Sequence, residues 1–263
     1  MDKVLNPSVA GTFYSSDSSV LRAEIEGLLA QADADLPIPK AIIAPHAGYS
    51  CSGKTAAAVY GCLKNTSKIK QVILLGPAHR YPFEGLAVTD ANYMATPLGN
   101  VAVDKKAIAK ILSLSQVNIV NAAYGNENSL EVQLPFLQVL LKDFLLVPLL
   151  IGNATNQQVV EVLEDLWGGD ETLVVVSSDL SHYLDYSSAK DIDQKTVDAI
   201  LALQPEKIGY EQACGRMAIN ALLTVAAKKK LQPKLIDLCN SGDTIGSKDQ
   251  VVGYVGVHFM EES

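Results

Sequence analysis

The stretch Val72-Ile73-Leu74-Leu75-Gly76-Pro77-Ala78-His79 is an apolar run that breaks at a glycine and a proline and then reaches a histidine. The run is apolar throughout rather than at alternate positions, which is typical of a strand covered on both faces of a sheet. Two further stretches have the same form, Ala41-Ile42-Ile43-Ala44-Pro45-His46 and Leu173-Val174-Val175-Val176-Ser177-Ser178-Asp179-Leu180-Ser181-His182. We therefore predict three buried strands, each followed by a loop that carries a histidine.

Strands and helices are predicted to alternate along the whole chain. The expected strands cover Ala41–Ala44, Gln71–Leu75, Leu86–Thr89, Val117–Val120, Phe144–Leu150, Leu173–Val176, Lys234–Leu238 and Val251–Phe259. The expected helices cover Ser19–Ala32, Ala56–Leu63, Thr155–Trp167, Asp191–Leu203 and Gly215–Lys228. This alternation predicts an α/β fold, a three-layer sandwich with a central mostly parallel or mixed sheet and helices on both faces. We find no repeat and no linker, so we expect a single domain over residues 1–263.

The composition excludes several classes of function. The chain has 263 residues, with 21 Lys and Arg against 29 Asp and Glu, and a net charge of −8. Its only basic cluster, Lys228-Lys229-Lys230, is expected to end a helix, so we predict no nucleic-acid partner. The longest apolar run, Phe144–Ile151, is too short for a membrane span, and the N-terminal stretch does not resemble a signal peptide. Four cysteines form no disulfide framework, so a cytoplasmic protein with reduced thiols is expected.

Three of the four histidines, His46, His79 and His182, follow predicted strands. Open α/β sheets bind ligands outside the carboxyl ends of their strands, where these imidazoles could converge. Histidine is the commonest metal ligand and a frequent proton carrier, so the pattern favours a metal site or an acid–base site. His258 lies inside a terminal strand pattern, and we expect it to be structural.

Cys214 precedes the predicted helix over residues 215–228. A thiol at a helix N-terminus is biased toward the thiolate, which binds metals and attacks substrates. A small buried hydrophobic residue is an equally good interpretation. The other three cysteines lie within helix or strand patterns and are expected to be structural. Ser177, Asp179 and His182 are too close in sequence to form a typical hydrolase triad.

The chain resembles the Memo family (mediator of ErbB2-driven cell motility), whose prokaryotic members are called AmmeMemoRadiSam system protein B. The segments that carry the resemblance run from Asn6 to about Val257 and are NPSVAGTFY, IIAPHAGYSCSG, ILLGPAHR, ENSLEVQLPFLQ, SSDLSHY, ACGR and NSGDTIGSKDQVVGYVGV. The resemblance implies the fold of the class III extradiol dioxygenases, whose enzymes hold non-haem iron. NPSVAGTFY is apolar and aromatic, and we expect it to form an ordered wall near the cleft.

The resemblance also implies a metal site made of His46, His79 and Cys214, with Asp179 and His182 lining the pocket. Iron or copper is the expected metal and zinc is possible, because a His/His/Cys set suits all three. We expect Asp179 to stay ionised and orient an imidazole, and His182 to carry protons. By resemblance, association with AMMECR1-like and radical SAM proteins is also expected.

The sequence departs from the family at two places. Asn128 stands where the family usually has a histidine, which removes one candidate proton carrier. After the CGR motif, this chain has Met217-Ala218 where a Gly or His followed by Pro is common. We expect the second change to alter the pocket rim and leave the cysteine in place.

Three functions are compatible with these residues. The leading hypothesis is a cytosolic non-haem metal-dependent dioxygenase or oxidoreductase that takes a small molecule or peptide in its cleft. The second is a binding module whose vestigial cleft recognises a peptide or small anion. The third is a metal-dependent hydrolase, in which Asp179 or His182 activates a water at the metal.

Overall fold

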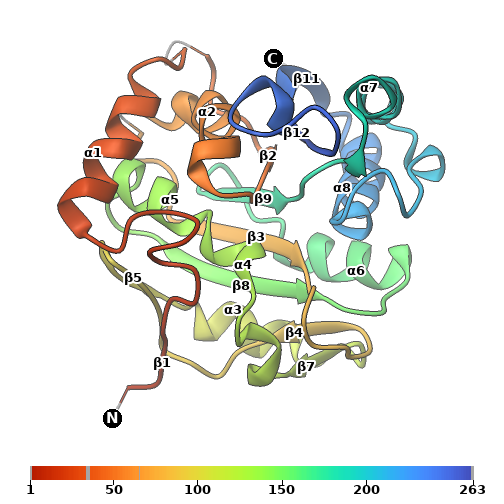
Figure 1. Ribbon diagram of the computed structural model, residues 1–263. Coiled ribbons are helices and arrows are strands. Elements are labelled where there is room, and N and C mark those ends of the chain that lie inside the picture. Colours follow the sequence, from red (N-terminus) through yellow and green to blue (C-terminus); the bar gives the residue numbers. More distant parts are fainter. Residues whose placement is uncertain (1, 34–35, 65, 262–263) are drawn as a thin grey trace.

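The structure is a computed structural model that describes residues 2–33, 36–64 and 66–261 (Figure 1). The strands of its main sheet are β2 (Ala41–Ala44), β3 (Gln71–Pro77), β4 (Leu86–Val88), β7 (Val117–Ile119), β8 (Leu145–Ile151), β9 (Thr172–Ser177), β10 (His182–Leu184), β11 (Gln232–Asn240) and β12 (Val251–Met260). Among the described residues they form one nine-stranded mixed sheet in the order β10-β12-β2-β9-β3-β8-β4-β7, and β11 pairs with β12. β1 (Val4–Leu5), β5 (Tyr93–Thr96) and β6 (Gly99–Ala102) form a separate three-stranded sheet.

Helices cover both faces of the main sheet. They are α1 (Ser18–Leu29), α2 (Tyr49–Tyr60), α3 (Lys105–Ile111), α4 (Asn128–Glu131), α5 (Leu134–Leu140), α6 (Asn156–Leu166), α7 (Tyr186–Leu201) and α8 (Arg216–Lys229). α2 packs on β2, β11 and β12 with α1 beside it, whereas α8 packs on β3 and β9 with α6 beside it. Figure 1 shows α1 and α2 on one side of the central strands and α6 and α8 on the other. The predicted three-layer α/β sandwich is confirmed.

The centre of the sheet determines where a site can form. β2, β9, β3 and β8 are adjacent and parallel, with Ile43 opposite Val176 and Val176 opposite Leu75. Nearly every residue in these four strands is buried, which explains why the runs are apolar at every position. Because parallel strands end at the same edge, the segments that follow Ala44, Pro77 and Ser177 leave the sheet side by side.

All eight predicted strands are present, and the differences lie in short elements and in where two helices begin. α2 begins at Tyr49 rather than at Ala56. β1, β5 and β6 were not expected, since they have two to four residues and lack a clear apolar pattern. α7 begins at Tyr186, not Asp191, because the Asp185 side chain accepts hydrogen bonds from the N–H groups of Ser187 and Ser188. His182 lies in the short strand β10, which pairs with β12, rather than in a loop.

The N-terminal segment is held against the body of the protein by one buried carboxylate. Glu131 in α4 accepts hydrogen bonds from the backbone N–H of Ser8 at 2.6 Å, from that of Val9 at 3.0 Å and from the Tyr14 hydroxyl at 2.6 Å. The carbonyl of Phe13 accepts a hydrogen bond from the backbone N–H of Tyr49. The segment is therefore ordered, as predicted.

Other features of the described part of the chain concern its ends, its cysteines and its helices. α8 ends at the lysine cluster, with Lys228 and Lys229 in its last turn. The four cysteines of the described part of the chain are all unpaired. Across residues 2–33, 36–64 and 66–261, no helix combines the length and the apolarity needed to cross a bilayer. The predicted domain also includes residues 1, 34–35, 65 and 262–263, which lie outside the described part.

Candidate metal centre

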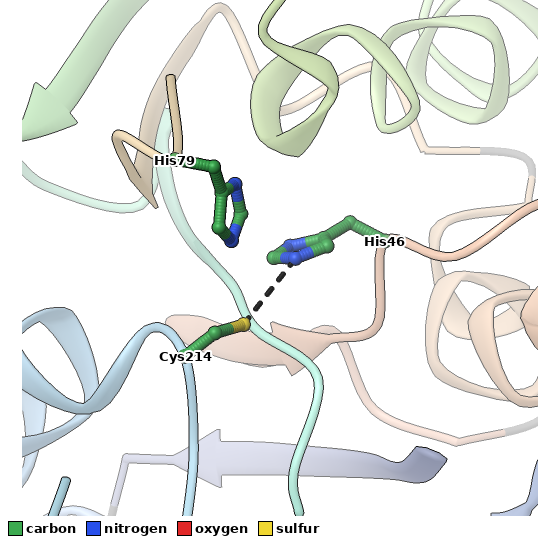
Figure 2. A group of neighbouring side chains, drawn as sticks. All are labelled: His46, His79 and Cys214. Atoms are coloured by element: carbon green, nitrogen blue, oxygen red, sulfur yellow. Dashed lines mark hydrogen bonds between the residues drawn. The ribbon is translucent and has the colours of Figure 1, made fainter. Parts of the chain in front are cut away.

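His46, His79 and Cys214 point toward one another at the carboxyl edge of the sheet (Figure 2). One ligand atom from each, two imidazole nitrogens and one sulfur, lies within 4.8 Å of the others. His46 follows β2, His79 follows β3, and Cys214 lies two residues before α8. The structure thus brings together the three residues that the family resemblance implies as ligands. Asp179 and His182 are not members of this group.

A chain of hydrogen bonds fixes the tautomer of His46. Ser177 Oγ lies 2.5 Å from the carbonyl oxygen of Ser129, which can only accept, so the hydroxyl proton is used there. The same Oγ accepts from the side-chain amide of Gln133 at 2.8 Å. His46 Nδ1, 3.0 Å from Ser177 Oγ, must therefore donate its proton to that oxygen. This leaves a lone pair on His46 Nε2, which faces Cys214 Sγ at 3.3 Å.

Glu127 orients the second imidazole in a similar way. Its Oε1 lies 2.9 Å from His79 Nδ1, and its Oε2 accepts the backbone N–H of His79 at 2.6 Å. Burial would raise the pKa of Glu127, but the hydrogen bonds from His79 and from the N–H of Ser129 hold it below its ordinary value. An ionised carboxylate that accepts from Nδ1 presents Nε2 as the free lone pair, the arrangement found behind metal-binding histidines.

The electrostatics of the centre favour neutral side chains before a metal binds. Burial, together with the nearby His79, lowers the pKa of His46 to about 3. Burial, together with the carboxylate of Asp179, raises the pKa of the Cys214 thiol to about 12. Of the two interpretations of Cys214, the buried neutral residue therefore describes the metal-free protein better than the thiolate. Because α8 begins only at Arg216, its first turn does not outweigh the loss of hydration at Cys214.

Asp179 lies beside the centre and contacts the His46 backbone. Its Oδ1 accepts the backbone N–H of His46 at 2.8 Å, and its Oδ2 lies 4.0 Å from His46 Nε2. Burial raises the pKa of this carboxyl group, although the hydrogen bond from His46 opposes the change. Its hydrogen bond to His46 therefore orients the backbone, whereas Ser177 orients the ring.

His182 lines the cavity beyond the three-residue group. Its Nδ1 lies 2.8 Å from the carbonyl of Leu180 and therefore carries a proton, so Nε2 is the nitrogen left for contacts with a ligand. Asn128 lines the same cavity, and its amide donates to the carbonyl of His46 at 3.3 Å. His258 is 1% exposed, and its Nε2 lies 2.7 Å from the carbonyl of Val59, so the prediction that it is structural is confirmed.

The cavity above these residues has a volume of about 1070 Å³. Phe13 from the N-terminal segment forms part of its wall, as predicted. Tyr81, Tyr183 and Tyr210, which are 44%, 70% and 82% exposed, also line it. The space is large enough for a drug-sized small molecule or several residues of a peptide.

Sequence reasoning missed the residues that hold the imidazoles, namely Glu127, Ser129, Gln133 and Ser177. One signal was available in the segment ENSLEVQLPFLQ. Glu127, Glu131 and Gln133 are charged or polar residues in an otherwise largely apolar helical stretch, and all three are buried. Buried polar groups require partners, so such a segment marks a polar network inside the protein.

Comparisons with known proteins agree over almost the whole chain. The family model described as Memo-like protein matches residues 6–258. A MEMO1 family protein of Aquifex aeolicus is 33% identical over 98% of this chain and 100% of its own length. A MEMO1 family protein of Methanosarcina mazei is 34% identical over 95% of this chain and 97% of its own length.

One solved structure, an uncharacterised protein from Escherichia coli, aligns with a TM-score of 0.45 and 14% identity over 97% of this chain and 99% of its own. A likeness of this size adds nothing to the fold assignment, which rests on the sheet order and the helix layers. The family match and the two relatives, by contrast, span nearly the full length of the chain at more than 30% identity. The chain belongs to the Memo family.

Proposed function

We propose that this protein is a non-haem metal-dependent oxidoreductase, with dioxygenase-like chemistry, and that His46, His79 and Cys214 hold one iron or copper ion. The observation that carries the proposal is the orientation of the two imidazoles. Each Nδ1 proton is committed to a buried acceptor, so both Nε2 lone pairs are left as free ligand atoms beside the sulfur of Cys214.

The donor set fits a transition metal. Two imidazole nitrogens and one cysteine sulfur suit iron, copper or zinc, and hard ions such as magnesium prefer oxygen ligands. A bound iron or copper ion would supply redox and Lewis-acid chemistry, with positions left open for a substrate. Ser177 and Glu127 keep the rings in place, which lowers the entropy lost when the ligands are fixed.

The remaining polar side chains of the cavity have separate tasks. His182 offers an imidazole nitrogen with a free lone pair and is the proposed proton carrier. Asp179 holds the backbone of His46 and acts as a positioning residue. Asn128 cannot exchange protons near neutral pH, so its amide can only form hydrogen bonds. The substrate is proposed to be a small molecule or a peptide within the cavity.

Elemental analysis of protein purified without chelator tests the proposal. About one iron or copper per chain, lost in a Cys214→Ser variant that still folds, would support it. Tightly held zinc would favour the metal-dependent hydrolase instead. A protein that takes up none of these metals after loading would be a binding module with a vestigial cleft.

The cellular setting belongs to the same proposal. Unpaired thiols throughout the described part are in keeping with a cytoplasmic location. Association with AMMECR1-like and radical SAM proteins stays a prediction from the family, and co-purification of tagged protein from its own cells would test it.

A further inference from the structure

The arginines of this chain are few and unevenly placed. Of its 21 basic residues only three are arginines, namely Arg22, Arg80 and Arg216, and the rest are lysines. Arg80 and Arg216 both line the cavity of the candidate metal centre, and no lysine of the described part does. Most basic residues of this protein are therefore lysines, whereas those at this cavity are arginines. The guanidinium group differs from an ammonium group in its planar fork of donors, which matches an oxyanion.

Arg216 is the first residue of α8 and is half-buried. Its guanidinium carbon lies 5.4 Å from the centre of the Tyr210 ring, and its Nη1 lies 3.1 Å from the sulfur of Met217. No ion pair joins it to any carboxylate of the described residues. Arginine stays protonated at every relevant pH, so a positive charge with unused donors faces the cavity.

Arg80 provides a second positive charge at the same cavity. It directly follows His79, is exposed, and forms no ion pair with a carboxylate in the part of the chain that the structure covers. Arg22, on the outer helix α1, lies 3.9 Å from Glu26. The chain has a net charge of −8, yet among its described residues neither arginine at the cavity has a carboxylate partner, whereas Arg22 has one.

The charges around the cavity also limit the charge of the ligand. Among the described residues, the carboxylates of Glu84, Asp179 and Glu211 line the same space. Glu84 accepts hydrogen bonds from the side chain of Asn153, and Asp179 accepts one from the backbone of His46. With two cations and three carboxylates around it, a singly charged carboxylate would meet less repulsion than a doubly charged phosphate.

We propose that Arg216, assisted by Arg80, binds the carboxylate of a small-molecule ligand whose remaining part occupies the cavity beside the metal centre. The guanidinium lies over the Tyr210 ring, and its planar fork of N–H groups can form a bidentate pair with the two oxygens of a carboxylate. The inference rests on the proposed function only in naming the substrate class of that site, since these contacts do not require the metal.

Calorimetric titration with benzoate and its neutral isostere benzamide tests this subsite, with both metal-free and metal-loaded protein. Benzoate should bind more tightly than benzamide in both forms. Arg216→Gln should weaken benzoate binding by about 10- to 100-fold, the range expected for a charge-assisted hydrogen bond, and leave benzamide unchanged. The benzoate affinity of Arg216→Lys should lie between those of the wild type and Arg216→Gln. Arg80→Gln should weaken benzoate binding a few-fold. Arg22→Gln is the matched control and should have no effect.

Thermal unfolding and metal content, measured on every variant, separate this inference from the proposed function. Loss of benzoate binding in Arg216→Gln with full metal content supports the carboxylate subsite. Equal affinity for benzoate and benzamide, no benzoate binding at millimolar concentration, or unchanged binding in a folded Arg216→Gln variant would overturn it. Tighter binding of phenyl phosphate than of benzoate would also overturn the assignment to a carboxylate. A protein that takes up neither iron nor copper after loading, yet still binds benzoate through Arg216, would refute only the proposed function.

Discussion

Two cysteine–histidine pairs in this protein look alike and have different surroundings. Cys214 Sγ lies 3.3 Å from His46 Nε2, and Cys62 Sγ lies 3.6 Å from His258 Nε2. Both histidines are almost fully buried, and burial raises the pKa of both thiols to about 12. Proximity and burial are therefore shared by a candidate metal centre and by an ordinary part of the core.

The difference lies in which imidazole nitrogen carries the proton. His258 Nε2 donates to the carbonyl of Val59 at 2.7 Å, so the nitrogen that faces the sulfur is already used. His46 donates from Nδ1 and keeps a lone pair on Nε2. The pair of Cys214 and His46 also has a second imidazole, that of His79, and an adjoining cavity. The pair of Cys62 and His258 belongs to no group of potential metal ligands in the described residues. Hydrogen bonds on the far side of the ring thus distinguish a ligand from a core residue.

Removing an imidazole ligand should have the largest effect. His46→Ala and His79→Ala should each weaken metal binding by more than about 100-fold, beyond the loss usual for an outer hydrogen-bond partner. His258→Gln is the control, since its amide can still donate to Val59, and it should keep full metal content. Metal analysis after gel filtration measures this. Full metal occupancy in both alanine variants would contradict the proposed difference between the Cys214–His46 and Cys62–His258 pairs.

The two thiols offer a matched test of the same contrast. Cys214→Ser should lower metal affinity strongly, because a hydroxyl group is a poor ligand for iron or copper in its neutral form. Cys62→Ser should leave affinity unchanged and lower only the unfolding temperature, since it introduces a hydroxyl into an apolar region. Competition with a chelator of known affinity measures both. Equal effects of the two substitutions would mean that Cys214 is merely buried.

Proton transfer should depend on a histidine outside both pairs. Once a turnover assay exists, His182→Ala should reduce turnover by about 10²–10⁴-fold, the usual contribution of a general acid or base. It should keep its metal, because His182 is not part of the three-residue group. Near-normal turnover would contradict the proposed role, whereas loss of the metal would make His182 a ligand.

The hydrogen bond behind His79 should have a smaller effect. Glu127→Gln keeps the shape of the side chain but removes the charge that accepts the Nδ1 proton, so metal affinity should fall by about 10- to 100-fold. Glu131→Gln, one helical turn later on α4, alters another buried carboxylate that holds the N-terminal segment. It should lower stability without changing metal affinity. If both variants bind metal equally well, Glu127 has only a structural role.

His46 and His79 could be predicted from the sequence pattern and Cys214 only from the family resemblance, whereas the residues behind them could not be predicted. The strand before His46 and that before His79 are marked by local apolar runs, and parallel strands bring their ends together. The tautomer of His46 depends on Ser129 and Gln133, which are close in sequence, and on Ser177, which lies 44 residues beyond Gln133 and meets them only through packing.

The starts of two helices differ in the same way, since one depends on nearby residues and the other on a distant one. Asp185 followed by serines is a local capping signal from which the start of α7 could have been predicted. The start of α2 is different, because the backbone N–H of Tyr49 bonds to the distant carbonyl of Phe13. The sequence also left the protonation state of Cys214 open, since burial, which opposes a thiolate, is a property of the whole fold.

The dependence of metal affinity on pH should distinguish the two thiols most finely. In the metal-free protein Cys214 holds its proton up to a pKa of about 12, and His46 is neutral above about pH 3. Metal binding must therefore displace the thiol proton, whereas His46 has none to lose from Nε2. The contribution of Cys214 is thus one released proton, so between about pH 7 and pH 9 affinity should rise about tenfold for each pH unit and fall equally on acidification. Proton release into weakly buffered solution on metal addition measures this directly. Proton release should be unchanged in Cys62→Ser, although the Cys62 thiol has the same raised pKa in the wild type. If the wild-type protein releases no proton, Cys214 binds as a neutral thiol or not at all.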